Sequence, residues 1–367
     1  MDRNRRIVSW LVAGLVAVAG AAPAQDRGPA DDLFDLFKEG RVEEMVQQGK
    51  ALLATGTETA PVNLAVGQGL ATLDRCAEAE IFLRRAVELD AADKSWVYAW
   101  ANIHLGACAI LDGRDDDARR AWTAARDAGA TRNATRNASG NLAAFALDAR
   151  CDDWPSFRTE HFQFRFSDRL GDLDRAAFAR RRDQAYEVIS AWFGGGPDRP
   201  IRMVVWADQD EATSFGMPAL GFSKPEYYLV ETLANQTVGH EMTHVISYHA
   251  LHPVVRTGLI NEGVAVYLDQ TGRDRVAMAR EALAGARSAA GGTLPPISLR
   301  ALWDDWSLLD AGVSYPVAGA WVERLVQKGG RERFLAYFTD QTREHARAVY
   351  GADLEDWIDG FEHEIGL

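Results

Sequence analysis

The chain has 367 residues, 47% of them hydrophobic, so it is long enough for two domains that each bury a core. Its formal net charge of −13 argues against a nucleic-acid-binding protein, which would carry a basic patch. Three cysteines are too few for a fold that depends on a disulfide framework.

The first 24 residues have the composition of an export signal. A segment with three arginines precedes an apolar run over residues 7–18, and the small residues of Ala22-Pro23-Ala24 follow. The run is shorter than the roughly 20 residues that a helix needs to cross a bilayer. We therefore expect residues 1–24 to be removed and the mature protein to be periplasmic or secreted, without stable membrane insertion. An uncleaved anchor is the alternative.

Residues 25–150 form the next predicted domain, which is rich in alanine and leucine and has helical periodicity. One pattern recurs at an offset of 39 residues, because Gly67 and Leu83 correspond to Gly106 and Trp122. Small residues at these spacings resemble tetratricopeptide repeats, whose period is about 34 residues. The resemblance implies stacked helical pairs that bind a protein partner. A plain helical cap on the second domain is the alternative.

Two of the cysteines, Cys76 and Cys108, fall in neighbouring predicted helices. A disulfide between them after export is one alternative. The sequence favours two buried thiols, since cysteine often packs as a small hydrophobic residue. Cys151 lies at the end of the helical domain, and none of the three has the spacing of a metal site.

Residues 151–367 form the second predicted domain, in which a mixed sheet precedes a helical subdomain. A strand is expected wherever a short run alternates in polarity or is continuously apolar, at 161–166, 201–206 and 227–230. Longer periodic segments predict helices, at 172–193 and 315–364. The expected fold class is therefore a multidomain α and α+β protein.

A metal-binding pattern follows the last predicted strand, in His240-Glu241-Met242-Thr243-His244. Residues four apart share one face of a helix, so His240 and His244 can bind one ion. Glu262 follows within Asn261-Glu262-Gly263 and completes a set of two histidines and one glutamate. Such a set leaves the fourth position of a tetrahedral zinc ion for water. We therefore predict one Zn²⁺ per chain, bound by His240, His244 and Glu262.

The two motifs together resemble those of the gluzincin zinc metallopeptidases, chiefly the peptidase MA-like domains and more distantly the aminopeptidase N family. The resemblance covers roughly residues 157–364, and its specific part is 237–269. It implies a zincin-type catalytic domain that hydrolyses peptide bonds in a polypeptide substrate. It also implies that the strand before the metal-binding helix is the sheet edge along which the substrate pairs.

The resemblance assigns further roles around the metal. Glu241 is the general base that takes a proton from the zinc-bound water. Asp269, seven residues after Glu262, resembles a carboxylate that orients a ligand histidine, and an exposed Asp is the alternative. Tyr315 is the candidate donor to the oxyanion, and a structural tyrosine is the alternative.

One family segment is absent from this sequence. Aminopeptidase N relatives have a Gly-x-Met-Glu-Asn segment that binds the free amine of the substrate, and residues 200–236 contain no match. We therefore expect an endopeptidase. Two other classes of function stay open: an inactive exported scaffold that binds partners through its helical repeats, and a metallohydrolase of non-peptide amides or esters.

Overall fold

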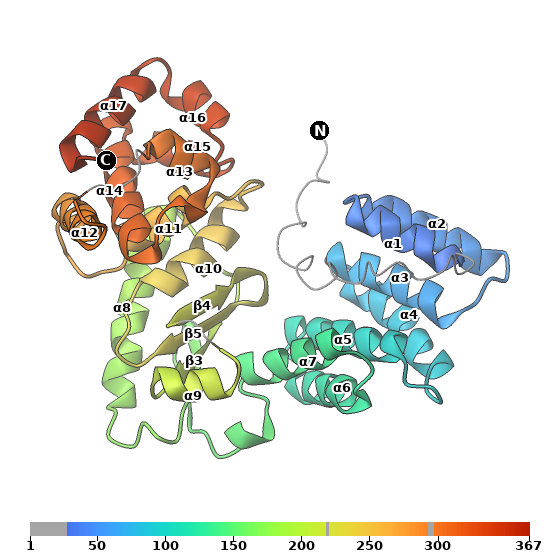
Figure 1. Ribbon diagram of the computed structural model, residues 1–367. Coiled ribbons are helices and arrows are strands. Elements are labelled where there is room, and N and C mark those ends of the chain that lie inside the picture. Colours follow the sequence, from blue (N-terminus) through green and yellow to red (C-terminus); the bar gives the residue numbers. More distant parts are fainter. Residues whose placement is uncertain (1–27, 218–219, 293–296) are drawn as a thin grey trace. The chain divides into compact units, whose positions relative to one another are not determined.

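The computed structural model describes residues 28–217, 220–292 and 297–367 (Figure 1). The chain forms two compact units, Met1–Asp153 with Ser214–Met217, and Trp154–Thr213 with Pro218–Leu367. We call them the helical unit and the sheet unit. The export signal predicted for residues 1–24 lies outside the described residues. In the described part of the chain, no helix is both long and apolar enough to span a membrane.

The helical unit is a succession of antiparallel helices (Figure 1). Consecutive helices pack against each other, and α1, α3, α5 and α7 also contact one another in turn, so that the helical hairpins are stacked. The helices are α1 (Pro29–Lys38), α2 (Val42–Ala54), α3 (Ala60–Thr72), α4 (Cys76–Leu89), α5 (Trp96–Leu111), α6 (Asp115–Ala128) and α7 (Arg132–Ala144), followed by the 3₁₀ turn η2 (Ala149–Cys151).

The 39-residue repeat in the sequence is also a repeat of one helix contact. A Cβ atom added at Gly67 would lie 2.6 Å from Cγ of Leu83, and one added at Gly106 would lie 2.3 Å from Nε1 of Trp122. In each pair, the glycine of the first helix therefore makes room for a large buried side chain of the second. The same kind of helix contact is thus built twice from corresponding residues.

Cys76 and Cys108 form a disulfide, so the preference for two buried thiols was wrong. Cys76 is the first residue of α4 and Cys108 lies in the last turn of α5. Because these helices are antiparallel neighbours, the start of one lies beside the end of the other, and the two Cα atoms are 5.3 Å apart. Cys151 is a buried thiol.

The sheet unit contains a five-stranded mixed sheet in the order β1-β2-β3-β5-β4. β2, β3 and β5 are parallel to one another, whereas the two edge strands are antiparallel to their neighbours. The strands are β1 (Ser156–Arg158), β2 (Phe162–Phe166), β3 (Ile201–Trp206), β4 (Gly221–Lys224) and β5 (Leu229–Leu233).

The strand predicted at 227–230 begins later in the chain, as β5 at 229–233, and it is not an edge strand of the sheet. Tyr227 ends the 3₁₀ turn η3 (Pro225–Tyr227), and Tyr228 has a positive φ of 54°. The strand that follows, β5, is buried along its whole length between β3 and β4. The edge beside the metal-binding helix is β4, which the sequence did not reveal.

Helices cover the sheet and form the rest of this unit. One hydrophobic core runs from the phenylalanines of β2 through the helices that follow the sheet to the C-terminal helix. The helices of this unit are α8 (Arg175–Phe193), α9 (Gln209–Ser214), α10 (His240–Leu251), α11 (Gly258–Tyr267), α12 (Arg275–Ala289), α13 (Leu299–Asp304), the 3₁₀ turn η4 (Trp306–Leu308), α14 (Ala311–Gly329), α15 (Arg331–Phe338), α16 (Arg343–Tyr350) and α17 (Asp353–Ile365).

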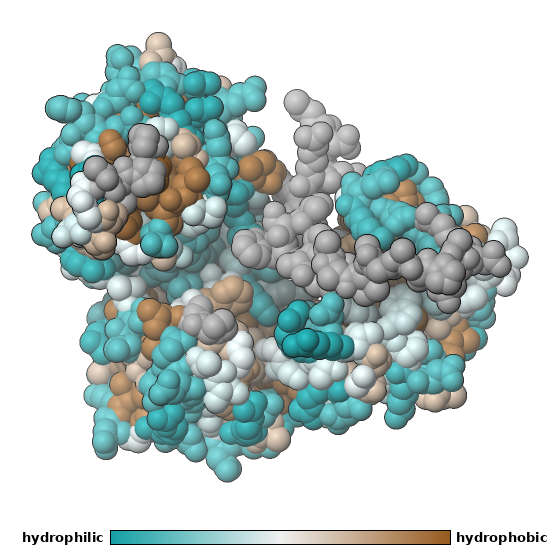
Figure 2. Space-filling view, in the orientation of Figure 1, coloured by the Kyte–Doolittle hydropathy of each residue, from teal (hydrophilic) through white to brown (hydrophobic). Residues whose placement is uncertain are grey.

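Polar side chains cover most of the visible face of each unit, with smaller apolar areas between them (Figure 2). The large apolar side chains that reach solvent are mostly isolated along the chain, such as Ile81 in the helical unit and Val188 in the sheet unit. The described part of the chain thus places most of its apolar residues in cores, as expected for a folded domain pair.

We predict that the disulfide stabilises the helical unit. It closes a separation of 32 residues, which corresponds to about 3–4 kcal/mol of unfolding free energy in the chain-entropy description. Replacing Cys76 and Cys108 by serine should lower the thermal midpoint of unfolding. Cys151→Ser is the control variant, because Cys151 lies outside the bridge. Denatured protein should react with a thiol reagent at one cysteine before reduction and at three after it. Three reactive thiols without reductant would contradict the bridge.

Candidate metal centre

The first part of the site is the start of α10. The helix begins at His240, and His244 follows one turn later on the same face. The two imidazole rings are 5.2 Å apart and nearly perpendicular. The side chain of His244 is 7% exposed and that of His240 is 16% exposed, so both imidazoles are largely sheltered from solvent.

The second part is the first half of α11, which brings Glu262 to both histidines. Oε2 of Glu262 lies 3.4 Å from Nε2 of His240 and 3.3 Å from Nε2 of His244. Burial raises the pKa of Glu262, but the two imidazoles lower it more, so the carboxylate is held in its charged form. The structure thus brings together the three residues that the sequence predicted as ligands.

The distance from Glu262 to each histidine fits a zinc ion. Zinc–ligand bonds of about 2.0–2.1 Å at tetrahedral angles place neighbouring ligand atoms about 3.3 Å apart. Both distances from Glu262 agree with this value. The donor set of two imidazole nitrogens and one carboxylate oxygen is typical of catalytic zinc sites, in which a fourth position takes water.

Asn261 contacts one of the predicted ligands, a role that the sequence analysis did not assign. Its side-chain amide lies 3.1 Å from Nδ1 of His244. The oxygen and nitrogen of an amide exchange places by a half-turn, so the same residue can accept a hydrogen bond from the Nδ1–H of His244. A metal-ligating histidine generally needs such an acceptor on its other nitrogen. In the sequence, the only sign of this role was that Asn261 directly precedes Glu262.

Glu241 lies between the metal ligands and the edge strand β4. The hydroxyl of Ser223 donates a hydrogen bond to its carboxylate. A Cβ atom at Gly221 would lie only 2.5 Å from Oε1 of Glu241, so the strand can approach the carboxylate this closely because it has glycine there. Burial raises the pKa of the Glu241 carboxyl, and the pKa stays raised although the nearby imidazoles of His240 and His244 lower it. Such a carboxylate is a better proton acceptor than an exposed one.

Tyr315, in the second turn of α14, also lies at the site. Its ring stacks on that of His240, with centroids 5.8 Å apart, and its hydroxyl donates to Glu262. Burial raises the pKa of the Tyr315 hydroxyl, and so do the neighbouring carboxylates of Glu262 and Glu241. The hydroxyl therefore stays protonated and can act as a hydrogen-bond donor at neutral pH.

Close packing of α14 on α11 sets the position of Tyr315. A Cβ atom at Gly263 would lie 2.6 Å from the carbonyl oxygen of Ala318, and one at Gly319 would lie 2.4 Å from the side chain of Val266. A larger residue at either glycine would push the two helices apart. Tyr315 would then move away from Glu262, which belongs to the opposite helix.

Asp269 does not contact a ligand histidine, contrary to the role that the family resemblance implied. Nor is it exposed, since only 3% of its surface reaches solvent. Its carboxylate accepts hydrogen bonds from Thr271, Arg273 and Arg275. The physical reason is that α11 ends at Tyr267, so Asp269 no longer lies on the helical face of Glu262.

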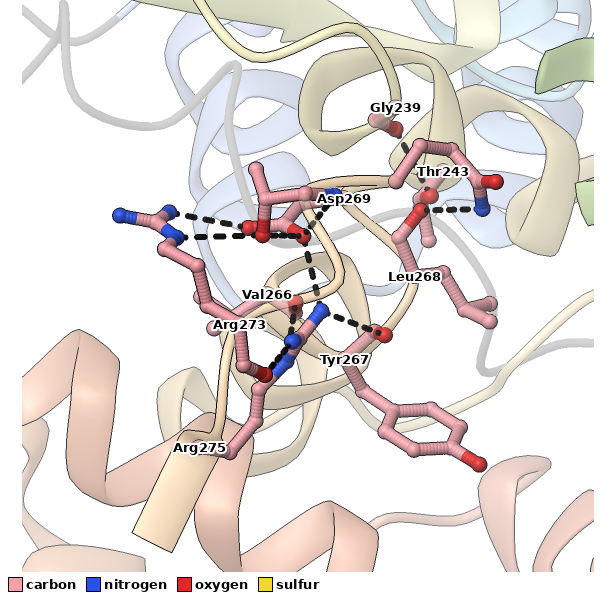
Figure 3. A network of polar contacts seen from close by, with 10 residues as sticks. Gly239, Thr243, Val266, Tyr267, Leu268, Asp269, Arg273 and Arg275 are labelled. Carbon is pink, nitrogen blue, oxygen red and sulfur yellow. Dashed lines mark hydrogen bonds and ion pairs between the residues drawn. The ribbon is translucent and has the colours of Figure 1, made fainter. Parts of the chain in front are cut away.

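The contacts of Asp269 form a network that joins the two ligand helices (Figure 3). The guanidinium of Arg275 donates to the carbonyl oxygens of Val266 and Tyr267, which end α11, and to Asp269. The carbonyl oxygen of Asp269 in turn accepts from the backbone N–H of Gly239, directly before His240, at 3.3 Å. The end of α11 is thus fixed against the start of α10.

We predict that Arg275 holds the metal ligands in place. Arg275→Gln should weaken zinc binding by about tenfold, the lower end of the range for residues that support metal ligands. Arg273→Gln is the matched control, because Arg273 contacts the same carboxylate but its side chain is 50% exposed. Zinc dissociation constants should be measured by chelator competition well below the unfolding temperature. Equal affinities for the two variants would contradict the prediction.

Comparison with known proteins does not identify the chemistry of this site. No family model matches the chain, and no curated protein matches it. The chemistry is therefore inferred from two imidazoles and a carboxylate that converge, with a buried carboxylate and a phenol beside them.

Proposed function

We propose that this chain is an exported zinc-dependent endopeptidase whose sheet unit is a zincin-type catalytic domain of the gluzincin kind. The observation that carries the proposal is the convergence of His240, His244 and Glu262, with Glu262 at the spacing of zinc ligands from both histidines. The buried carboxylate of Glu241 next to them supplies the second requirement of such an enzyme, a general base.

A zinc ion bound by these three residues would lower the pKa of a water molecule and polarise the carbonyl group of the scissile peptide bond. Glu241 takes the proton from the attacking water, since its carboxylate is buried and its pKa is raised. The same carboxyl group then delivers the proton to the leaving amine. One residue thus acts first as base and then as acid.

Tyr315 supplies the donor that the developing oxyanion needs. Its hydroxyl already donates to Glu262, so it lies within reach of atoms that bind at the same centre. A donor aimed at the oxyanion stabilises the transition state more than the bound substrate. The ring of Tyr315 is held by its stacking on His240, which limits the freedom of the hydroxyl.

The free edge of β4 is the proposed binding line for the polypeptide. β4 pairs with β5 on one side, and no described strand pairs with its other side. An extended substrate can add to such an edge through backbone hydrogen bonds, which accept many sequences. Glu241 lies beside this strand, at Gly221 and Ser223. Pairing along β4 would therefore bring a peptide bond to the base.

For the helical unit we propose a tetratricopeptide-like array that binds a protein substrate or adaptor. Its stacked hairpins and its repeated glycine contact support a repeat architecture. The disulfide between Cys76 and Cys108 supports export, because disulfides persist mainly in oxidising compartments.

The experiment that tests the proposal compares three proteins for zinc content and for digestion of a peptide library. The wild type should hold one zinc per chain and cleave peptides. Glu241→Gln should keep the zinc but lose about 10²–10⁴-fold in rate, because an amide of the same shape accepts no proton. Glu262→Ala should lose the zinc as well. Undiminished turnover by Glu241→Gln, or tight zinc binding by Glu262→Ala, would exclude the proposed roles.

Tyr315→Phe should lower kcat by about 10²–10³-fold with little change in KM, if the hydroxyl binds the oxyanion only in the transition state. Zinc content should stay at one per chain, since Tyr315 is not a ligand. Tyr267→Phe is the control, because it removes the hydroxyl of a half-buried tyrosine at the last residue of α11. An unchanged kcat for Tyr315→Phe would assign this tyrosine a purely structural role.

A further inference from the structure

Arg256 lies in the loop between the two ligand helices, and its surroundings suggest that it binds substrate. Its guanidinium lies over the ring of Tyr248, 5.5 Å from the centroid. Tyr248 follows His244 by four residues on α10, so it continues the face that carries the metal ligands. Arg256 therefore lies about one helical turn beyond the metal ligands.

The loop that carries this arginine is fixed on both sides. The N–H of Val254 donates to the carbonyl oxygen of Thr339 at 2.8 Å, and the carbonyl oxygen of Val255 accepts from the N–H of Gln341 at 3.1 Å. Directly after the arginine, the N–H of Thr257 donates to the side chain of Gln341 at 2.9 Å. The backbone around the guanidinium is thus held in place before any ligand binds.

Arg256 has no counter-charge in the described part of the chain. Its guanidinium contacts the Tyr248 ring, and no described carboxylate lies within ion-pair distance of it. Its side chain is nevertheless half-buried. A guanidinium that is partly removed from water and lacks a partner gains more from a bound carboxylate than a fully solvated one does.

The direction of β4 shows which part of a substrate would meet this arginine. Gly221 lies at Glu241, and the carbonyl oxygen of Pro225, just after β4, lies 2.8 Å from Nε2 of His249. β4 and α10 therefore run in the same direction, and the end of β4 lies toward the end of α10. A peptide that pairs antiparallel to β4, the more stable arrangement, places its residues before the scissile bond toward that end.

We propose that Arg256 binds an Asp or Glu side chain two or three residues before the scissile bond, which makes acidic polypeptide segments the preferred substrates. The inference rests on the proposed function, which supplies the position of the scissile bond. One helical turn of α10 and the reach of the arginine amount to on the order of 10 Å, or about three residues of extended chain. A positive charge there also disfavours a free N-terminal amine, in agreement with cleavage inside polypeptides.

The test uses pairs of N-acetylated peptides that differ only by Glu or Gln at the second or third residue before the cut. The wild type should cleave the Glu peptide with a kcat/KM about 10- to 100-fold higher, as expected for a hydrogen bond between charged groups. Arg256→Gln should bring this ratio close to one, and Arg256→Lys should restore part of it. Arg333→Gln is the matched control, because Arg333 lies 5.4 Å from the ring of Tyr350, outside the metal site.

A binding measurement separates this inference from the proposed function. Fluorescence polarisation of the labelled peptides on zinc-loaded Glu241→Gln protein, with and without Arg256→Gln, needs no turnover. A Glu preference that depends on Arg256 in binding, without any cleavage by the wild type, would refute the peptidase but keep the anion site. A wild type that binds and cleaves both peptides equally would overturn the inference. So would a preference that Arg256→Gln retains, or an acidic preference found only after the scissile bond.

Discussion

The sheet unit depends on one close approach, between the start of α10 and the end of α11. The predicted ligands come from two helices, and their atoms have to lie within about 0.5 Å of ideal positions for a metal to bind. A Cβ atom at Gly239 would lie 2.5 Å from the carbonyl oxygen of Leu268, so only glycine lets the two chain segments meet. The Asp269–Arg275 ion pair at 2.8 Å then stabilises this junction.

A second close approach extends the same arrangement to α14. Gly263 and Gly319 let α11 and α14 pack with their backbones almost in contact, and this brings Tyr315 over His240. The core that supports these helices is continuous with the core under the sheet. Glu241 and Tyr315, although 74 positions apart in the chain, are therefore parts of one rigid assembly.

Sequence reasoning succeeded where spacing along one helix determines the geometry. The four-residue interval from His240 to His244 fixes their common face. The helix predicted at 172–193 does end at Phe193, and Gly194 follows it in the left-handed conformation. The central strand at 201–206 was also identified from its apolar run. These features depend on local chemistry alone, which the sequence expresses directly.

The features that were missed depend on contacts between distant segments. β4 has only four residues, and Gly-Phe-Ser-Lys lacks the alternation that marks a strand, so its place at the edge comes from pairing with β5. Asp269 was assigned by its distance from Glu262, but the helix ends before it. The disulfide required the axial register of α4 and α5, which helical periodicity does not determine.

The edge position of β4 has a consequence for how specificity would be distributed along a substrate. Side chains of an extended chain point alternately to the two sides of the sheet. On β4, Gly221 and Ser223 face Glu241, whereas Phe222 pairs with Glu231 on the opposite face. A bound polypeptide would follow the same alternation. If the proposed peptidase activity is present, its cleavage sites should therefore alternate between positions of strict and of permissive side-chain preference, because the pleat turns every second side chain to the same face.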